Sequence, residues 1–289
     1  MPRALDRRRE RGWHDRGLGR FLLHERPNYV LFELVIWRFR VGKCGQGLLV
    51  LIQFMKDTIR KTLARIVPSL DPLHHYEKRL ADKPAAEVFS TIYRKNVWGG
   101  QRRKYYSGWG SRDPIIVEPY IRAVSAHLKQ KARPSVVEIG CGDFQVGRRL
   151  VPYVSRCIAC DIVSDLIEHH RRNLKLENVE FRVVNAIEDE LPSGDIVLVR
   201  QVLQHLSNKH IASILPKLRA YREAIITEHV PSGSFVPNLD KETGPHYRAH
   251  LSSGIVLTEP PFQIEAKERR VLCEAPSNGG IVRTELYVF

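Results

Sequence analysis

The chain has 289 residues, of which 43% are hydrophobic and 27% are charged, and its formal net charge is +14. This length allows one substantial buried core with an appendage, and the composition excludes disordered and fibrous proteins. The charge is uneven, because residues 1–133 hold 28 Lys and Arg against 12 Asp and Glu, and the remainder holds 18 against 20. A basic first half fits either an anionic partner or a solvated basic face.

Residues 1–54 form a basic extension with two apolar patches, residues 29–37 and 48–54. Neither patch reaches the twenty or so apolar residues that span a bilayer, so we expect no transmembrane segment. Two interpretations stay open for this extension: a peripheral membrane contact, or a misassigned start upstream of Met55, which opens a well-patterned amphipathic segment.

Residues 55–133 show helical periodicity and predict an N-terminal helical cap. Within it we expect helices over residues 87–93 and 115–130. Glycine and aromatic loops lie between them, at residues 96–100 and 105–111.

Residues 134–289 alternate strand and helix patterns, which predicts an α/β domain with a mainly parallel sheet and right-handed crossovers. The expected strands are 135–139, 156–161, 179–184, 194–199 and 223–228, and the expected helices lie near 144–153, 163–174 and 208–220. Residues 230–260 look like a surface loop long enough to suspect a function. The tail predicts an antiparallel hairpin around Asn278-Gly279-Gly280.

Five cysteines, two of them on an expected buried strand, indicate a reducing compartment, so we expect a cytoplasmic protein. The spacing of Cys157 and Cys160 suits a redox or zinc half-site, but a strand points them to opposite faces. No second pair follows at metal spacing. We therefore interpret both as core residues and predict no metal site.

A sharp glycine turn follows the first expected strand, in the run Val136 to Phe144. Gly140 and Gly142 permit the turn and a close ligand approach, whereas Gln145 stands where a dinucleotide fingerprint needs its third glycine. Asp161 ends the next strand about twenty residues after the turn, at the spacing of a ribose-diol acceptor.

The E-x-G-x-G motif from Glu138 to Gly142 resembles motif I of class I S-adenosylmethionine (SAM) dependent methyltransferases. The resemblance covers roughly residues 85–289 and implies a Rossmann-like fold with an antiparallel C-terminal hairpin. The chemistry agrees, because the α-ammonium and sulfonium of SAM favour carboxylates such as Glu138 and Asp143, which would repel a pyrophosphate. The runs Trp98-Gly99-Gly100, residues 107–111 and Gly142-Asp143-Phe144 are similar to a bacterial group of mostly unassigned substrate.

Candidate site residues follow from the turn, the strand ends and this resemblance. The predicted cofactor contacts are Trp98, Ser111, Glu138, Gly140, Cys141, Gly142, Asp143, Asp161, Ile162, Asn185, Ala186, Arg200 and Gln201. The candidate catalytic residues are His205, His229 and Asp240. His205 suits a general base, and a purely structural role is the alternative.

The sequence thus predicts a SAM-dependent enzyme that methylates oxygen on a sugar or small metabolite, with a small molecule or glycan as acceptor. Nucleic acid is not expected, because no Asp/Asn-Pro-Pro-aromatic motif follows the fourth strand and no Pro-Cys pair exists. Two alternatives remain: a non-catalytic SAM-binding module with an anionic partner, and an NAD-dependent oxidoreductase.

Overall fold

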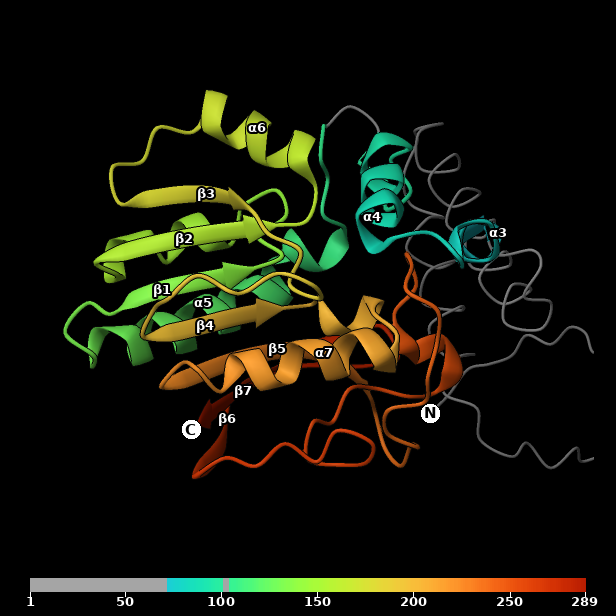
Figure 1. Cartoon of the computed structure of the whole chain (residues 1–289). Helices are drawn as coiled ribbons and strands as arrows, with labels where there is room; N and C mark the ends of the chain where they lie inside the picture. The colour runs from blue at the N-terminus through green and yellow to red at the C-terminus, as the bar shows by residue number, and fades with distance from the viewer. Residues whose placement is uncertain (1–71, 101–103) are drawn as a thin grey trace, which may run out of the picture. The chain divides into compact units, whose positions relative to one another are not determined.

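The computed structural model describes residues 72–100 and 104–289, which belong to one compact unit, Arg60–Phe289. Its centre is a seven-stranded sheet in the order β3-β2-β1-β4-β5-β7-β6 (Figure 1). The first five strands pair in parallel and the last two join as an antiparallel hairpin. The strands are β1 (Ser135–Ile139), β2 (Arg156–Asp161), β3 (Val179–Val183), β4 (Ile196–Arg200), β5 (Glu223–Pro231), β6 (Glu268–Ser277) and β7 (Gly280–Val288).

Helices cover both faces of this sheet. In Figure 1, α5 runs behind the sheet and α7 in front of it, while α3 and α4 lie beyond the carboxyl ends of the parallel strands. The α-helices are α3 (Pro72–Leu80), α4 (Ala85–Arg94), α5 (Pro114–Lys129), α6 (Ser164–Asn173) and α7 (Asn208–Leu218). The 3-10 turns are η2 (Trp109–Ser111), η3 (Gly147–Arg149), η4 (Val151–Tyr153), η5 (Leu203–His205) and η6 (Arg248–Leu251).

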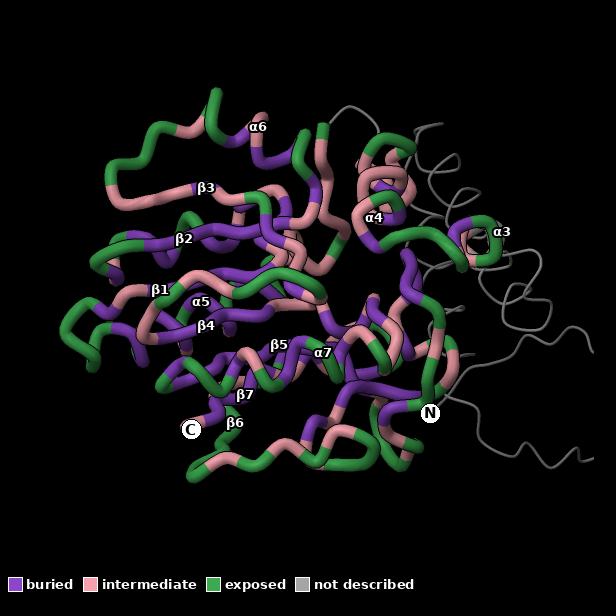
Figure 2. The backbone as a smooth tube through the Cα atoms, viewed as in Figure 1, coloured by how far each residue is buried: buried purple, intermediate pink, exposed green. Residues whose placement is uncertain are grey.

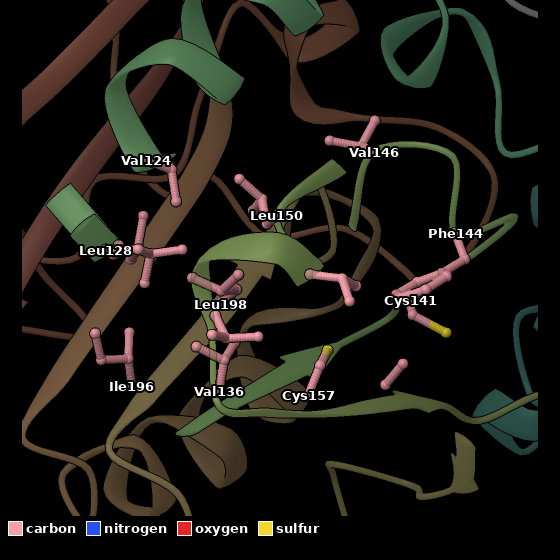
Figure 3. Packing of buried hydrophobic residues seen from close by; sticks show 14 of the residues in the cluster. Val124, Leu128, Val136, Cys141, Phe144, Val146, Leu150, Cys157, Ile196 and Leu198 are labelled. Carbon is pink, nitrogen blue, oxygen red and sulfur yellow. The ribbon is translucent and has the colours of Figure 1, made fainter. Parts of the chain in front are cut away.

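The central strands are buried on both faces, which accounts for their continuous apolar sequences. Successive side chains enter different cores: Val136 packs on the α5 side and Val137 on the α7 side. Figure 3 shows the first core, where α5 meets β1, β2 and β4, and Figure 2 shows burial concentrated along the strands. Cys157 and Cys160 divide between the two cores as free thiols, which confirms their interpretation as core residues.

Side-chain caps fix the starts of two helices. The Asp113 carboxylate accepts a hydrogen bond from the Ile115 backbone N–H at 2.9 Å, and Pro114 occupies the first helical position of α5. The Ser207 hydroxyl caps α7 by accepting from the backbone N–H of His210 at 3.4 Å. Both caps satisfy N–H groups that the helix itself leaves unpaired.

The predicted strands and hairpin are confirmed, with boundaries that move by a few residues. The predicted helix at residues 144–153 is wrong, because the segment forms only the single turns η3 and η4. Phe144 adopts a left-handed φ of 55°, and Pro152 has no N–H to donate, so a continuous α-helix cannot form.

The predicted surface loop at residues 230–260 is also wrong in its exposure. It contains η6, and several of its polar side chains are buried, namely Asn238, Thr243, His246, Arg248 and Ser253. Asn238 is an internal brace, because its side-chain nitrogen donates to three backbone carbonyls of residues 256–260.

The predicted basic extension, residues 1–54, and the amphipathic segment that begins at Met55 lie outside the described residues. Their domain boundaries therefore stay predictions. Among the helices of the described part, none has both the length and the apolar character needed to cross a membrane.

Leu198 tests the central packing. It lies on β4 with 2% exposure, so Leu198→Ala should lower the free energy of unfolding by about 2–5 kcal/mol through lost burial and a cavity. Val183→Ala, at a position of 44% exposure on β3, is the control and should change it by no more than about 0.5 kcal/mol. Chemical denaturation measures both, and equal effects would contradict the assigned core.

Candidate active site

A cavity of about 600 Å³ lies at the carboxyl ends of the parallel strands. All the predicted cofactor contacts line it: Trp98, Ser111, Glu138, Gly140, Cys141, Gly142, Asp143, Asp161, Ile162, Asn185, Ala186, Arg200 and Gln201. His205 and His229 line it too. The structure does not bring Asp240 into it; that carboxylate is exposed and accepts from the Asn208 backbone N–H at 2.7 Å.

The glycine turn after β1 is held by groups from separate elements. Gly142 donates its N–H to Asp161 Oδ2 at 3.0 Å, and its carbonyl lies 2.7 Å from His170 Nε2 of α6. Gly140 has a φ of 68°, and a Cβ there would lie 2.5 Å from Val202 Cγ2. Conformation and space therefore both require glycine at position 140.

The loop at residues 107–111 closes over this turn. The Ser107 hydroxyl accepts from the Asp143 backbone N–H at 2.7 Å. The Gly110 carbonyl accepts from Arg200 at 2.7 Å, and a Cβ on Gly110 would lie 2.5 Å from Gln201 Oε1. The loop thus joins the ends of β1 and β4 into one wall of the cavity.

Two buried carboxylates face the cavity near the turn. Burial raises the pKa of Glu138 to about 8, while the positive charge of Arg200 opposes that rise. Glu138 Oε2 is buried and has no hydrogen-bond partner among the described residues. Burial also raises the pKa of Asp161 to about 6, against backbone N–H bonds from Val163 and Gly142 that lower it. This end of the cavity suits a cationic ligand.

Asp143 is engaged within the protein. Its Oδ2 pairs with the Arg112 guanidinium at 2.8 Å, and its Oδ1 accepts from the Gln145 N–H at 3.2 Å. The sequence predicted that Asp143, like Glu138, attracts the cationic groups of SAM, but Arg112 balances its charge. A cationic ligand would therefore meet Asp161, and Glu138 once it ionises, rather than Asp143.

Arg200 is the only lysine or arginine among the described residues that line the cavity. Its guanidinium lies 5.1 Å from the centre of the Tyr120 ring, and its Nε is buried without a hydrogen-bond partner. Burial lowers the pKa of Arg200, and the neighbouring Tyr120 and Glu138 oppose this. A fixed cation beside a carboxylate can hold a zwitterionic group.

Two buried side chains, Glu228 and Arg248, fix the turn that follows β4. Glu228 of β5 accepts from the backbone N–H groups of residues 202, 203 and 204 at 3.2, 2.9 and 3.0 Å. Arg248 donates to the carbonyls of residues 203, 204 and 206 at 3.1, 3.3 and 2.7 Å. Burial raises the pKa of Glu228 to about 8, although these N–H bonds oppose the rise. Backbone N–H groups and carbonyls of this turn are therefore both hydrogen-bonded to buried side chains; we call this pair of side chains the clamp.

Gln204 connects the two cavity histidines. Its Oε1 accepts from the His229 backbone N–H at 3.1 Å, and its Nε2 lies 3.3 Å from His205 Nε2. His205 Nδ1 lies 3.1 Å from the His246 carbonyl. Burial, followed by the charge of Lys241, lowers the pKa of His205 to about 3. His205 is therefore neutral, and both ring nitrogens have internal partners.

Comparison with known proteins adds family evidence. A family model described as a methyltransferase domain matches residues 136–222. An uncharacterized RNA methyltransferase of Chlamydia trachomatis is 26% identical over 119 residues, which cover 37% of this chain and 30% of that protein. The chain thus spans less than a third of that relative.

Solved structures with a similar arrangement include human N-acetylserotonin methyltransferase in complex with SAM, at 16% identity and a TM-score of 0.46; the match covers 71% of this chain and 59% of that one. The N-methyltransferase NodS of Bradyrhizobium japonicum with S-adenosyl-L-homocysteine is 13% identical, with a TM-score of 0.49 and coverages of 68% and 98%. At these scores the assignment depends on the family match and the strand order.

The chain therefore carries a methyltransferase domain over residues 136–222. The predictions of a methyltransferase and of a mainly parallel α/β sheet with an antiparallel C-terminal hairpin are confirmed.

Several residues of the methyltransferase site carry no local signal in the sequence. Arg112 and His170 look like ordinary helix-end residues, and Arg248 looks like part of a polar loop, yet each binds a group at the cavity wall. Ser107 had a weak signal in the glycine-rich run around it. Glu228 had a signal too, because it is an acid that follows the apolar run Ala224 to Ile226 on the same strand.

Glu228→Gln should lower the free energy of unfolding of the methyltransferase by about 1–3 kcal/mol, because an amide nitrogen cannot accept from the clamped N–H groups. It should also weaken SAM binding, since residues 200–202 line the cavity. Chemical denaturation and calorimetry measure the two effects. Glu265→Gln, on an exposed carboxylate, is the control; a Glu228 variant as stable as this control would contradict the clamp.

Proposed function

We propose that the protein transfers the methyl group of SAM to a hydroxyl oxygen of a small-molecule acceptor. Bound SAM supplies an activated methyl group on a sulfonium centre, so the protein mainly has to hold the acceptor in line. The supporting observation is the unpartnered, buried Glu138 carboxylate at the end of the cavity formed by the glycine turn. A buried acceptor of this kind is costly unless a donor binds it.

The cavity lining supports a residue-by-residue placement of SAM. Asp161 ends β2 and would accept the ribose hydroxyls, and Asn185 and Ala186 follow β3, where the adenine would lie. Glu138 would accept from the α-ammonium, and Arg200 would donate to the α-carboxylate. The order of these groups along the sheet edge follows the strand order β3-β2-β1-β4.

The lining also favours a small molecule over RNA, despite the name of the chlamydial relative. Nucleic-acid binding depends on lysines and arginines that neutralise phosphates. Among the described lining residues only Arg200 has such a charge, and it is bound to the Gly110 carbonyl and stacked on Tyr120. Sugars and small metabolites both remain within the proposed acceptor class.

His229 is the better candidate for a proton acceptor than His205. Both nitrogens of His205 have internal partners, and its pKa is lowered to about 3, which suits a neutral positioning residue. His229 lies at the end of β5 and lines the same cavity. Asp240 has no place in this proposal, because it lies outside the cavity lining.

Asp161→Ala should weaken SAM binding by about 2–4 kcal/mol, since it removes charge-assisted hydrogen bonds to the ribose. Asp161 also accepts from the Gly142 and Val163 N–H groups, so the alanine variant should lose some stability as well. Asp161→Asn keeps the side-chain shape and separates the two effects. Calorimetric titration with SAM measures them, with NAD as the control ligand. An alanine variant that is folded and binds SAM as tightly as the parent would refute the placement.

Glu138→Gln tests the cationic end. The pKa of Glu138 in the cofactor-free fold, about 8, lies above its ordinary 4.5, so ionisation should make the parent less stable as pH rises between these values. The glutamine variant should lack this loss, and its stability relative to the parent should therefore increase from pH 5 to pH 8. It should also bind SAM at least about tenfold more weakly. Denaturation across pH and calorimetry check both; unchanged SAM affinity would refute the ammonium contact.

A further inference from the structure

The two ends of the cavity differ in chemistry. The charged lining residues Glu138, Asp143, Asp161 and Arg200 belong to the β1, β2 and β4 ends. At the β5 end, the lining comes from α4 with its following loop, the loop near residue 246 and the hairpin turn. There it includes Phe89, Trp98, His205, His229, Tyr247 and Asn278, none of them Asp, Glu, Lys or Arg. A phosphate or carboxylate on the acceptor would find no counter-charge among these residues.

Aromatic rings dominate this second end. The Trp98 ring centre lies 6.3 Å from that of Phe89 and 5.1 Å from that of His205, and its Nε1 donates to the Pro245 carbonyl at 3.1 Å. Tyr247 contacts the His229 ring edge to face, with centres 4.9 Å apart. Rings fixed in this way favour a planar aromatic ligand over a polyol, which needs many hydrogen-bonding groups.

His229 places a polar group in this aromatic end. The residue is only 4% exposed; the Asn278 backbone lies near its ring, but neither ring nitrogen makes a well-formed hydrogen bond in the described part of the chain. The Gln204 side chain fixes its backbone, and a side chain at Gly280 would collide with the ring. A buried imidazole without partners is costly, so its nitrogens are suited to a ligand that donates a hydrogen bond.

The basicity of His229 decides how acidic the acceptor hydroxyl has to be. Burial lowers the pKa of His229, although the nearby Asn278 backbone opposes that shift, so the ring is neutral and weakly basic. A phenol, with a pKa near 10, can pass its proton to such a ring far more easily than a sugar hydroxyl, whose acidity is close to that of water at about 15.7. The aromatic lining and the weak base His229 therefore both favour a phenol as the acceptor.

We infer that the acceptor is an uncharged phenol, bound between Trp98 and Tyr247 with its hydroxyl at His229; this rests on the proposed function. The phenolic oxygen forms a bond to the methyl carbon of SAM. The carbon–sulfur bond breaks and its electron pair stays on sulfur, which yields S-adenosylhomocysteine. The phenolic proton passes to a ring nitrogen of His229 and then to solvent.

The test separates cofactor binding, acceptor binding and proton transfer. Calorimetry first measures SAM binding to the full-length protein. The protein saturated with S-adenosylhomocysteine is then titrated with uncharged mono- and bicyclic phenols, including 2-naphthol, with methyl glycosides and with a short RNA. Turnover with SAM is followed by mass spectrometry of the methyl ether in the parent, in His229→Gln and in His169→Gln. His169, on α6 and outside the cavity lining, is the matched control.

Phenols should bind and the glycosides and RNA should not. His229→Gln should lower kcat for 2-naphthol by about 100-fold or more while SAM affinity stays within about twofold. The loss in this variant should shrink for phenols of lower pKa, each assayed below that pKa so that the acceptor is uncharged, which a merely structural role would not produce. His169→Gln should match the parent.

Contrary results have distinct meanings. SAM binding without phenol binding, or preferential binding of a glycoside or RNA, would overturn the phenol inference and leave the proposed function standing. Equal losses in His229→Gln for 2-naphthol and for uncharged phenols of lower pKa would overturn the role of His229 as base. Absence of SAM binding would refute the proposed function and this inference together.

Discussion

The cavity depends on the clamp that Glu228 and Arg248 apply to the turn after β4. Glu228 accepts from three consecutive backbone N–H groups, and Arg248 donates to three carbonyls of the same turn. Apart from the Leu203 carbonyl, which also accepts from the Leu206 N–H at 3.0 Å, these backbone groups would otherwise lack a partner in the described part of the chain, which is unfavourable near the core. The clamp also joins β5 and the segment around residue 248 to one short turn. That turn leads directly from the end of β4, where we propose cofactor contacts, to His205.

A second constraint is the parallel sheet itself. Helices cover both of its faces, so in the described part of the chain a ligand approaches at the edge where the strands end, where the cavity lies. Strand order then separates the site into a carboxylate-lined end at β1 and β2 and an aromatic end at β5 and the hairpin. Methyl transfer benefits from this division, because a cationic donor and an uncharged acceptor need opposite surroundings.

The two cavity histidines differ in the hydrogen-bond partners that the fold gives to their rings. His205 follows β4 and His229 lies near the end of β5, and the sequence offers no basis for ranking them. In the fold, Gln204 and the His246 carbonyl lie within hydrogen-bonding distance of the His205 ring nitrogens. Neither ring nitrogen of His229 makes a well-formed hydrogen bond in the described part of the chain. The aromatic neighbours of His229 then define the acceptor that we infer.

The sequence by itself determined three features: the glycine turn after β1, Asp161 at the end of β2, and the alternation of strands and helices that makes a parallel sheet. These features depend on local periodicity and fixed spacing, which can be recognised in the sequence alone. Only the tertiary structure decided that Arg112 neutralises Asp143, that residues 144–153 form separate turns, and that Arg248 is buried. The physical reason is that each of these outcomes arises from the packing of groups far apart in the chain. Such contacts leave no periodic pattern in the sequence, and their energy exists only once the sheet has assembled.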